Sequence, residues 1–81
     1  MERSEVENKI NEIIMELLGY KMKIKPEHKI WDDLGIDSLD WVEIVLVVQD
    51  TYNKEFSESE LEKITTVGEF VDYVYSQVKG G

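Results

Sequence analysis

The sequence predicts an all-α domain, a four-helix bundle with three long helices, one short helix and a long loop after the first helix. Three observations favour this class: apolar residues recur at helical spacing along most of the chain, capping motifs precede these segments, and no alternating pattern indicates paired strands. Because 81 residues suffice for one compact core, residues 1–81 are expected to form a single domain.

The first helix is expected to begin at Ser4, which forms a capping-box pattern with Glu7, and to end at Gly19. Its apolar positions are Val6, Ile10, Ile13, Ile14, Leu17 and Leu18. Residues 20–36 contain Pro26 and are predicted to form a loop. Scattered apolar residues are expected to anchor this loop to the core: Ile24, Ile30, Trp31 and Leu34. Long loops in small domains are uncommon, so this one indicates a function.

Three further pairs have capping-box spacing, and each is expected to open a helix: Asp37 with Asp40, Ser57 with Glu60, and Thr66 with Glu69. The second helix is predicted to run to about Tyr52, with Asn53 ending it, and the short third helix to about Lys63. The last helix has its apolar residues at Val67, Phe70, Val71, Val74 and Val78.

The second helix carries two apolar arcs when it is drawn on a helical wheel. An uncharged arc is expected to face the core: Trp41, Ile44, Val45, Val48 and Tyr52. The opposite arc places aliphatic residues beside polar and acidic ones: Leu39, Val42 and Leu46 with Glu43, Gln49 and Asp50. Packing does not require aliphatic residues on an acidic face, so this arc predicts a docking surface. Chance clustering of exposed aliphatic residues is the alternative.

Ser38 lies where the long loop meets the second helix, and Gly35 allows a tight turn just before it. The first turn of a helix offers free N–H groups and the positive end of the helix dipole, which tolerate the charge of a phosphodiester. An Asp-Ser pair at a helix start is also typical of a plain N-cap. Position alone leaves both interpretations of Ser38 open.

The net charge of −9 is uneven along the chain. Residues 1–29 are neutral, whereas twelve acids oppose three lysines from residue 30 onward. Such a surface repels nucleic acid and anionic membrane and attracts basic proteins, although acidity also serves solubility. The chain has no cysteine, no apolar run near the ~18 residues of a membrane span, and no signal-peptide pattern, so a soluble cytoplasmic protein is expected.

Residues 33–40, Asp-Leu-Gly-Ile-Asp-Ser-Leu-Asp, resemble the phosphopantetheine attachment motif of acyl carrier proteins, and Ser38 matches the serine of that motif. The resemblance continues through residues 42–44, 62–67 and 71–74, which are similar to the bacterial fatty-acid branch of the family. It implies the four-helix fold of that family.

The resemblance further implies that a phosphopantetheinyl transferase moves 4'-phosphopantetheine from coenzyme A onto Ser38, that acyl groups are carried as thioesters on the arm, and that the chain is not an enzyme. Enzymes of fatty acid or related lipid and polyketide biosynthesis are the implied partners, with basic patches that dock a monomeric carrier. The implied docking residues are Asp37, Leu39, Asp40, Val42, Glu43, Leu46 and Asp50. The corresponding acyl pocket comprises Trp41, Val45, Val48, Leu61, Ile64, Phe70 and Val71.

Three features depart from the fatty-acid branch. Trp41 stands where that branch usually has a smaller residue, Gln49 stands where an acid is common, and the loop carries Lys21, Lys23, Lys25 and Lys29. These departures concern the cargo and the pathway. A structural subunit acting through its acylated form, and a peptidyl or aminoacyl carrier, remain alternatives.

Other sites are less well supported by the sequence. A nucleophilic Ser38 would need His28, the only histidine, as its base, and no Gly-x-Ser-x-Gly elbow surrounds it. A calcium site is not expected, because Asp32, Asp33 and Asp37 lack the spacing of a calcium loop. The C-terminal Gly80-Gly81 is similar to the tail of ubiquitin-like modifiers, but the helical periodicity of the chain argues against that fold.

Overall fold

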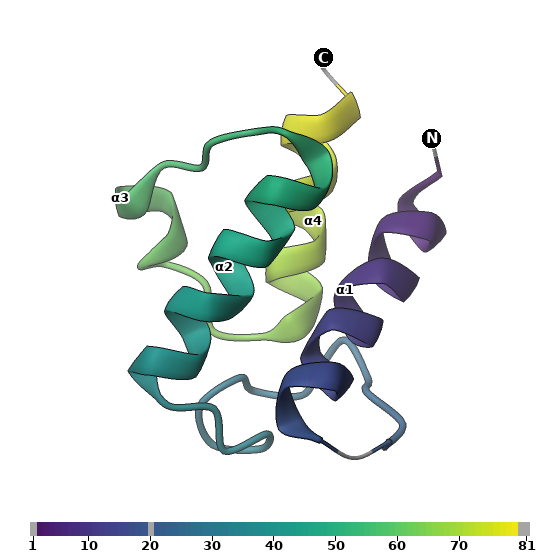
Figure 1. Cartoon of the computed structure of the whole chain (residues 1–81), viewed down its shortest axis with the longest axis vertical. Coiled ribbons are helices and arrows are strands. Elements are labelled where there is room, and N and C mark those ends of the chain that lie inside the picture. Colours follow the sequence, from purple (N-terminus) through teal and green to yellow (C-terminus); the bar gives the residue numbers. More distant parts are fainter. Residues whose placement is uncertain (1, 20, 80–81) are drawn as a thin grey trace.

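The computed structural model describes residues 2–19 and 21–79, which form four α-helices joined by loops (Figure 1). In chain order the helices are α1 (Arg3–Leu18), α2 (Ser38–Tyr52), α3 (Glu58–Leu61) and α4 (Val67–Lys79). Within these ranges the only β-type pairing is an isolated bridge between Lys29 and Thr66. The predicted all-α class, with three long helices, one short helix and a long first loop, is confirmed.

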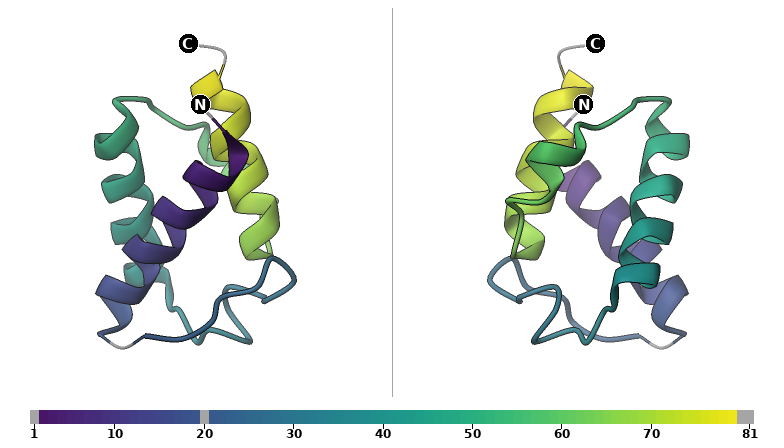
Figure 2. Two further views of the ribbon diagram at one scale, coloured as in Figure 1. Left: turned by 90° about the vertical axis from the view of Figure 1, so that its right-hand side faces the viewer. Right: turned by 90° about the vertical axis from the view of Figure 1, so that its left-hand side faces the viewer.

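Helix α1 packs against both α2 and α4, so the three long helices share one core. Figure 2 shows α1 crossing one side of the α2 and α4 pair, whereas α3 lies on the other side. The buried apolar residues of the long helices are Val6, Ile10, Ile13, Ile14, Ile44, Val45, Val48, Val67, Phe70, Val71 and Val74. Those outside the long helices are Ile30, Leu34, Ile36, Phe56, Leu61 and Ile64.

The start of α1 differs from the prediction. Glu2 occupies the N-cap position without a side-chain hydrogen bond, and the predicted cap Ser4 lies inside the helix. Arg3, in the extra turn, contacts residues across and along the fold: its Nε donates to Asp72 Oδ1 on α4 at 2.6 Å, and its guanidinium also pairs with Glu7 at 3.7 Å. Glu7 therefore serves an ion pair on the helix surface instead of a capping box.

The ends of α2 follow the prediction. The Asp37 Oδ1 accepts a hydrogen bond from the Asp40 N–H at 2.9 Å, which satisfies one of the free amides of the first turn. At the other end Asn53 adopts a left-handed conformation with φ of 54°. There the pKa of the Tyr52 hydroxyl is raised, mainly by burial and further by the negative charge of Glu5 on α1.

Helix α3 is a single turn, which ends at Leu61, before the predicted Lys63. Ser57 is its N-cap residue, but the predicted side-chain cap is absent, because the Ser57 hydroxyl instead lies 2.9 Å from that of Ser59. Two contacts hold the segment before α3 against α4. The Ser57 N–H donates to the Tyr73 hydroxyl at 2.9 Å, and the Phe56 and Tyr73 rings meet edge to face at 5.5 Å.

The predicted capping box at the start of α4 is confirmed. The Thr66 N–H donates to Glu69 Oε1 at 2.9 Å, and the Glu69 N–H donates to Thr66 Oγ1 at 3.1 Å. The same carboxylate oxygen accepts from the N–H and hydroxyl of Thr65. The backbone donors of Thr65 and Thr66, followed by the Thr65 hydroxyl, lower the pKa of Glu69 from its ordinary value of 4.5 to about 2.

The long loop is tied to the start of α4. Three backbone hydrogen bonds join them: Ile30 N–H to Thr65 C=O (2.9 Å), Val67 N–H to His28 C=O (3.0 Å) and Gly68 N–H to Pro26 C=O (2.9 Å). A Cβ at position 68 would lie 3.1 Å from Cβ and from the carbonyl oxygen of Pro26, so glycine permits this approach.

Of the four predicted loop anchors, Ile30 and Leu34 are buried and Ile24 packs half-buried against the core. The prediction is wrong for the fourth, Trp31, which is 40% exposed and does not anchor the loop in the core. Its indole instead lies against the indole of Trp41 on α2. The loop is therefore held by its backbone and by aliphatic residues.

Candidate functional site

Ser38 is the first residue of α2 and is exposed. Asp37, and not Ser38, is the N-cap of the helix. No hydrogen bond joins the Ser38 hydroxyl to another residue in the described part of the chain. A free, exposed hydroxyl beside the positive end of a 15-residue helix is suited to carry a phosphodiester.

The end of the loop fixes the direction in which Ser38 points. Gly35 has a φ of +66°, which favours glycine, and the flanking Leu34 and Ile36 are buried. The Ile36 N–H donates to the Ile30 carbonyl at 3.3 Å, which closes the turn. Burial of the aliphatic residues on both sides of the glycine leaves the following Asp37 and Ser38 facing solvent.

The predicted docking residues lie on or near the surface of α2. Leu39, Val42 and Leu46 are 80%, 54% and 57% exposed, which is unusual for three aliphatic residues on one helix. The acidic residues Asp37, Glu43 and Asp50 are exposed, and Asp40 is half-buried. Sequence reasoning missed Val47, whose side chain is 42% exposed. Its place in the apolar run 45–48 gave no sign that it would face solvent.

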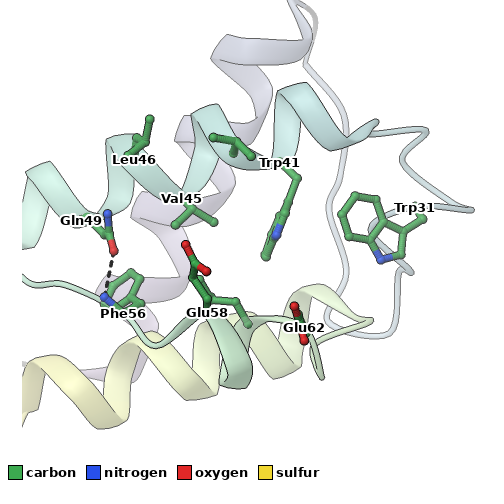
Figure 3. Close-up of a pocket in the computed structure, with 10 residues that line it drawn as sticks. Trp31, Trp41, Val45, Leu46, Gln49, Phe56, Glu58 and Glu62 are labelled. Atoms are coloured by element: carbon green, nitrogen blue, oxygen red, sulfur yellow. Dashed lines mark hydrogen bonds between the residues drawn. The ribbon is translucent and has the colours of Figure 1, made fainter.

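A groove of about 490 Å³ lies between α2 and the α3 segment, which comprises residues 56–62 (Figure 3). Its walls are Trp31, Trp41, Val42, Val45, Leu46, Gln49, Phe56, Glu58, Leu61 and Glu62. The volume falls within the usual range for small-molecule sites, about 300 to 1,000 Å³. Gln49 is held in place because its Oε1 accepts the Phe56 N–H at 2.8 Å, as Figure 3 shows.

The groove contains three of the seven residues predicted to form an acyl pocket. Trp41, Val45 and Leu61 line it. The other four are buried in the core and are not among its walls: Val48, Ile64, Phe70 and Val71. The groove also includes residues from the α3 segment that the sequence did not indicate, such as Phe56 and Glu58.

Trp41 separates the groove from the core. Its ring centroid lies 4.8 Å from that of buried Phe70, at an interplanar angle of 61°, and 5.6 Å from that of Trp31, at 68°. Edge-to-face contacts of this kind add to the stability gained from burial. The half-buried indole therefore stands between the open groove and the core around Phe70.

The residues considered for a catalytic base or a calcium site have structural roles. His28 Nδ1 accepts the Lys25 N–H at 3.0 Å, so this histidine serves the loop and no hydrogen bond links it to Ser38 in the described ranges. Asp33 Oδ2 accepts the Lys29 N–H at 2.7 Å, and Asp37 caps α2. Among the described residues no group of three or more acids or histidines is placed to hold a metal ion. Gly80 and Gly81 lie outside the described residues.

None of the helices in the described part of the chain is both long and apolar enough to cross a membrane. The surface charge is uneven: α2 carries three acids, Asp40, Glu43 and Asp50, and no base, and its N-cap Asp37 adds a fourth acid. The four loop lysines form no ion pair with a described residue. The surface around Ser38 is therefore negative, apart from the helix dipole itself.

Comparisons with known proteins agree with this geometry. The family described as "Phosphopantetheine attachment site" matches residues 8–74. The structure is similar to the crystal structure of an acyl carrier protein from Thermotoga maritima, with a TM-score of 0.85 and 27% identity over 99% of this chain and 94% of that one. It is also similar to the acyl carrier protein of Enterococcus faecalis, with a TM-score of 0.77 and 36% identity over 95% and 99% of the two chains.

The fold alone is shared with the holo acyl carrier protein of Geobacter metallireducens, which is 20% identical at a TM-score of 0.81 over 93% of this chain and 87% of that one. The family match spans most of the chain, including the loop, α2 and the α3 segment. The family's prosthetic group is 4'-phosphopantetheine, and its members carry cargo without catalysing a reaction. The chain belongs to the phosphopantetheine-attachment family, as an acyl carrier protein.

Proposed function

We propose that Ser38 is the residue to which phosphopantetheine is attached, and that the chain delivers acyl thioesters to enzymes of fatty acid or related lipid or polyketide biosynthesis. The observation that carries the proposal is the free hydroxyl of Ser38 at the start of α2, beside a cap supplied by Asp37. Because Asp37 satisfies the helix end, Ser38 can be modified without loss of a cap.

The exposed face of α2 is the proposed docking surface for these enzymes and for the phosphopantetheinyl transferase. Acids at its rim attract basic patches over a distance, and aliphatic residues such as Leu39 and Leu46 are exposed for burial in the complex. Residues 1–81 act as one monomeric carrier domain in this proposal. The cytoplasm is its proposed location, in keeping with the absence of cysteine.

The groove between α2 and the α3 segment is the proposed resting place of the acyl group. Its walls include Val42, Val45 and Leu61, which offer apolar contact to a chain attached at Ser38 on the same helix. Trp41 closes the groove toward Phe70, so the cargo lies along the groove and not in the core. Docking and cargo binding then use adjoining parts of α2.

Intact mass measurement tests the attachment site. The protein is incubated with a phosphopantetheinyl transferase and coenzyme A, beside Ser38→Ala and the matched control Ser57→Ala, which changes another exposed serine at a helix start. Wild type and Ser57→Ala should gain one phosphopantetheine each, and Ser38→Ala should gain none. A modified Ser38→Ala protein, or an unmodified wild type, would overturn the proposal.

A further inference from the structure

The long loop concentrates positive charge on an otherwise acidic chain. Four of the nine basic residues lie within residues 21–29, where Glu27 is the single acid, and all four are exposed: Lys21, Lys23, Lys25 and Lys29. The function proposed for Ser38 and α2 uses none of these lysines. Exposed like charges that lie close together repel one another, so folding alone does not favour the cluster.

Most of the other basic residues have partners within the fold. Arg3, Lys9 and Lys63 form ion pairs with acids, and the Lys79 ammonium lies 5.4 Å from the centre of the Tyr75 ring. By contrast, no ion pair joins a loop lysine to any residue in the ranges 2–19 and 21–79, although the chain has 18 acids. The loop therefore presents charge that is available to a partner.

Three of these lysines share one face of residues 21–25. Lys21, Lys23 and Lys25 are exposed, whereas Met22 and Ile24 between them are half-buried and pack against the core. Burial with a period of two is typical of an extended strand, in which alternate side chains point the same way, roughly 7 Å apart. The segment runs across one end of the bundle, from the end of α1 toward the start of α4 (Figure 2). The two apolar residues thus hold a lysine strip, Lys21, Lys23 and Lys25, toward solvent.

The backbone of the same segment has an open edge. No amide or carbonyl of residues 21–24 forms a hydrogen bond with a described residue. The end of the segment is fixed, because the Lys25 N–H donates to His28 Nδ1 and the Lys25 carbonyl accepts the His28 N–H, both at 3.0 Å. The Pro26 carbonyl then accepts the Gly68 N–H of α4 at 2.9 Å. An anchored extended segment with unpaired backbone groups is a template for the addition of a strand.

The side chains and the backbone of this segment point to the same kind of ligand, since lysines attract carboxylates and an open edge pairs with an extended chain. We infer that residues 21–25 bind an extended acidic segment of a partner protein, which adds as a strand. Its alternate carboxylates lie opposite the lysine strip, and its backbone forms hydrogen bonds with the open edge.

An extended peptide fits this place better than a nucleic acid or an anionic membrane. A peptide strand contacts the lysine strip alone, whereas a larger polyanion also brings its charge near the acidic remainder of a chain with a net charge of −9. The lysine strip shares no residue with the docking surface of α2, which attracts basic partners. The inference therefore goes beyond the proposed function and does not depend on modification of Ser38.

An NMR titration of the full, unmodified chain with two peptides tests the inference. The probe is the acetylated and amidated heptapeptide Glu-Thr-Glu-Thr-Glu-Thr-Glu, whose carboxylates alternate. The control peptide, Glu-Glu-Glu-Glu-Thr-Thr-Thr, has the same composition and charge without the alternation. Shifts of the backbone amide signals locate the binding site, and their dependence on peptide concentration gives the affinity.

Two triple variants separate the lysine strip from net charge. They carry equal changes in charge, and circular dichroism verifies that both are folded. The strip variant combines Lys21→Gln, Lys23→Gln and Lys25→Gln, and the matched variant combines Lys9→Gln, Lys54→Gln and Lys63→Gln.

The alternating peptide should shift the amide signals of residues 21–25 most strongly and should bind more tightly than the control peptide. The strip variant should bind it about tenfold more weakly, because three exposed charge pairs are lost, whereas the matched variant should stay within about twofold of wild type. Absence of shifts at residues 21–25, equal affinity for both peptides, or equal weakening in both variants would contradict the inference. Shifts caused by phosphatidylserine vesicles and not by the peptide would assign the strip to a membrane and would likewise overturn it.

Discussion

Asp37 caps the helix that begins with Ser38: its Oδ1 accepts the Asp40 N–H at 2.9 Å, and the neighbouring serine hydroxyl is left free. The two adjacent side chains thus have separate roles. One stabilises the helix end, and the other is available for attachment. A serine that had to cap its own helix would lose the cap on modification.

This division predicts that two neighbouring substitutions differ in their effect on stability. Ser38→Ala should change the free energy of unfolding by no more than about 0.5 kcal/mol, the usual scale of a neutral surface change. Asp37→Ala should lower it by about 1 kcal/mol, because a helix cap is lost. Urea denaturation followed by circular dichroism measures both. A larger loss for Ser38→Ala than for Asp37→Ala would contradict the assignment of the cap.

The proposed docking surface predicts a kinetic effect of charge reversal. Glu43→Lys or Asp40→Lys should slow association with a phosphopantetheinyl transferase that has a basic patch, and should weaken the dependence of the rate on salt. Glu12→Lys, on α1, makes the same change in net charge and is the control. Stopped-flow measurements at several salt concentrations give the rates. Equal slowing by all three variants would point to net charge alone and against a docking face.

The capping box of α4 predicts a specific dependence of stability on pH. Folding lowers the pKa of Glu69 from 4.5 to about 2, so its contribution is fully present above pH 4.5 and is lost as the pH falls toward 2. Glu69→Gln removes this titration. The difference in unfolding free energy between wild type and Glu69→Gln should therefore shrink as the pH falls from 4.5 to 2. Urea titrations at a series of pH values test this, and a constant difference would refute it.

Local motifs predicted those parts of the molecule that depend on nearby residues. The pair Thr66 and Glu69 carries its own cap, so four residues suffice to place the start of α4. At the start of α1, Arg3 instead contacts Asp72, which is 69 positions away, and the Ser4 pattern could not reveal that contact. Long-range contacts of this kind have no local signal.

The same distinction explains which parts of the candidate site the sequence predicted. The helical wheel correctly predicted that Leu39 and Leu46 are exposed, because the period of one helix fixes which residues share a face. The groove is made by two segments, and its α3 wall depends on how Phe56 packs against Tyr73. No periodicity in α2 contains that information.

The last prediction concerns Trp41, whose indole stands between the groove and Phe70. If it limits the depth of the groove, Trp41→Thr should open a path toward the core and accept longer acyl chains. The arm is loaded with saturated acyl groups of increasing length, and melting temperatures are recorded for wild type, Trp41→Thr and Trp31→Thr. The last variant removes the indole that is 40% exposed at the edge of the groove.

Burial of a chain stabilises the folded state, so Trp41→Thr should gain more than wild type from the longer chains, even though loss of the indole lowers its stability without cargo. The gain of Trp31→Thr should follow that of wild type, because no ring contact joins Trp31 to Phe70 among the described residues. Identical chain-length profiles for wild type and Trp41→Thr would mean that the indole only packs between its two aromatic neighbours. A larger gain in both variants would place the limit on chain length at the paired indoles, and not at Trp41 alone.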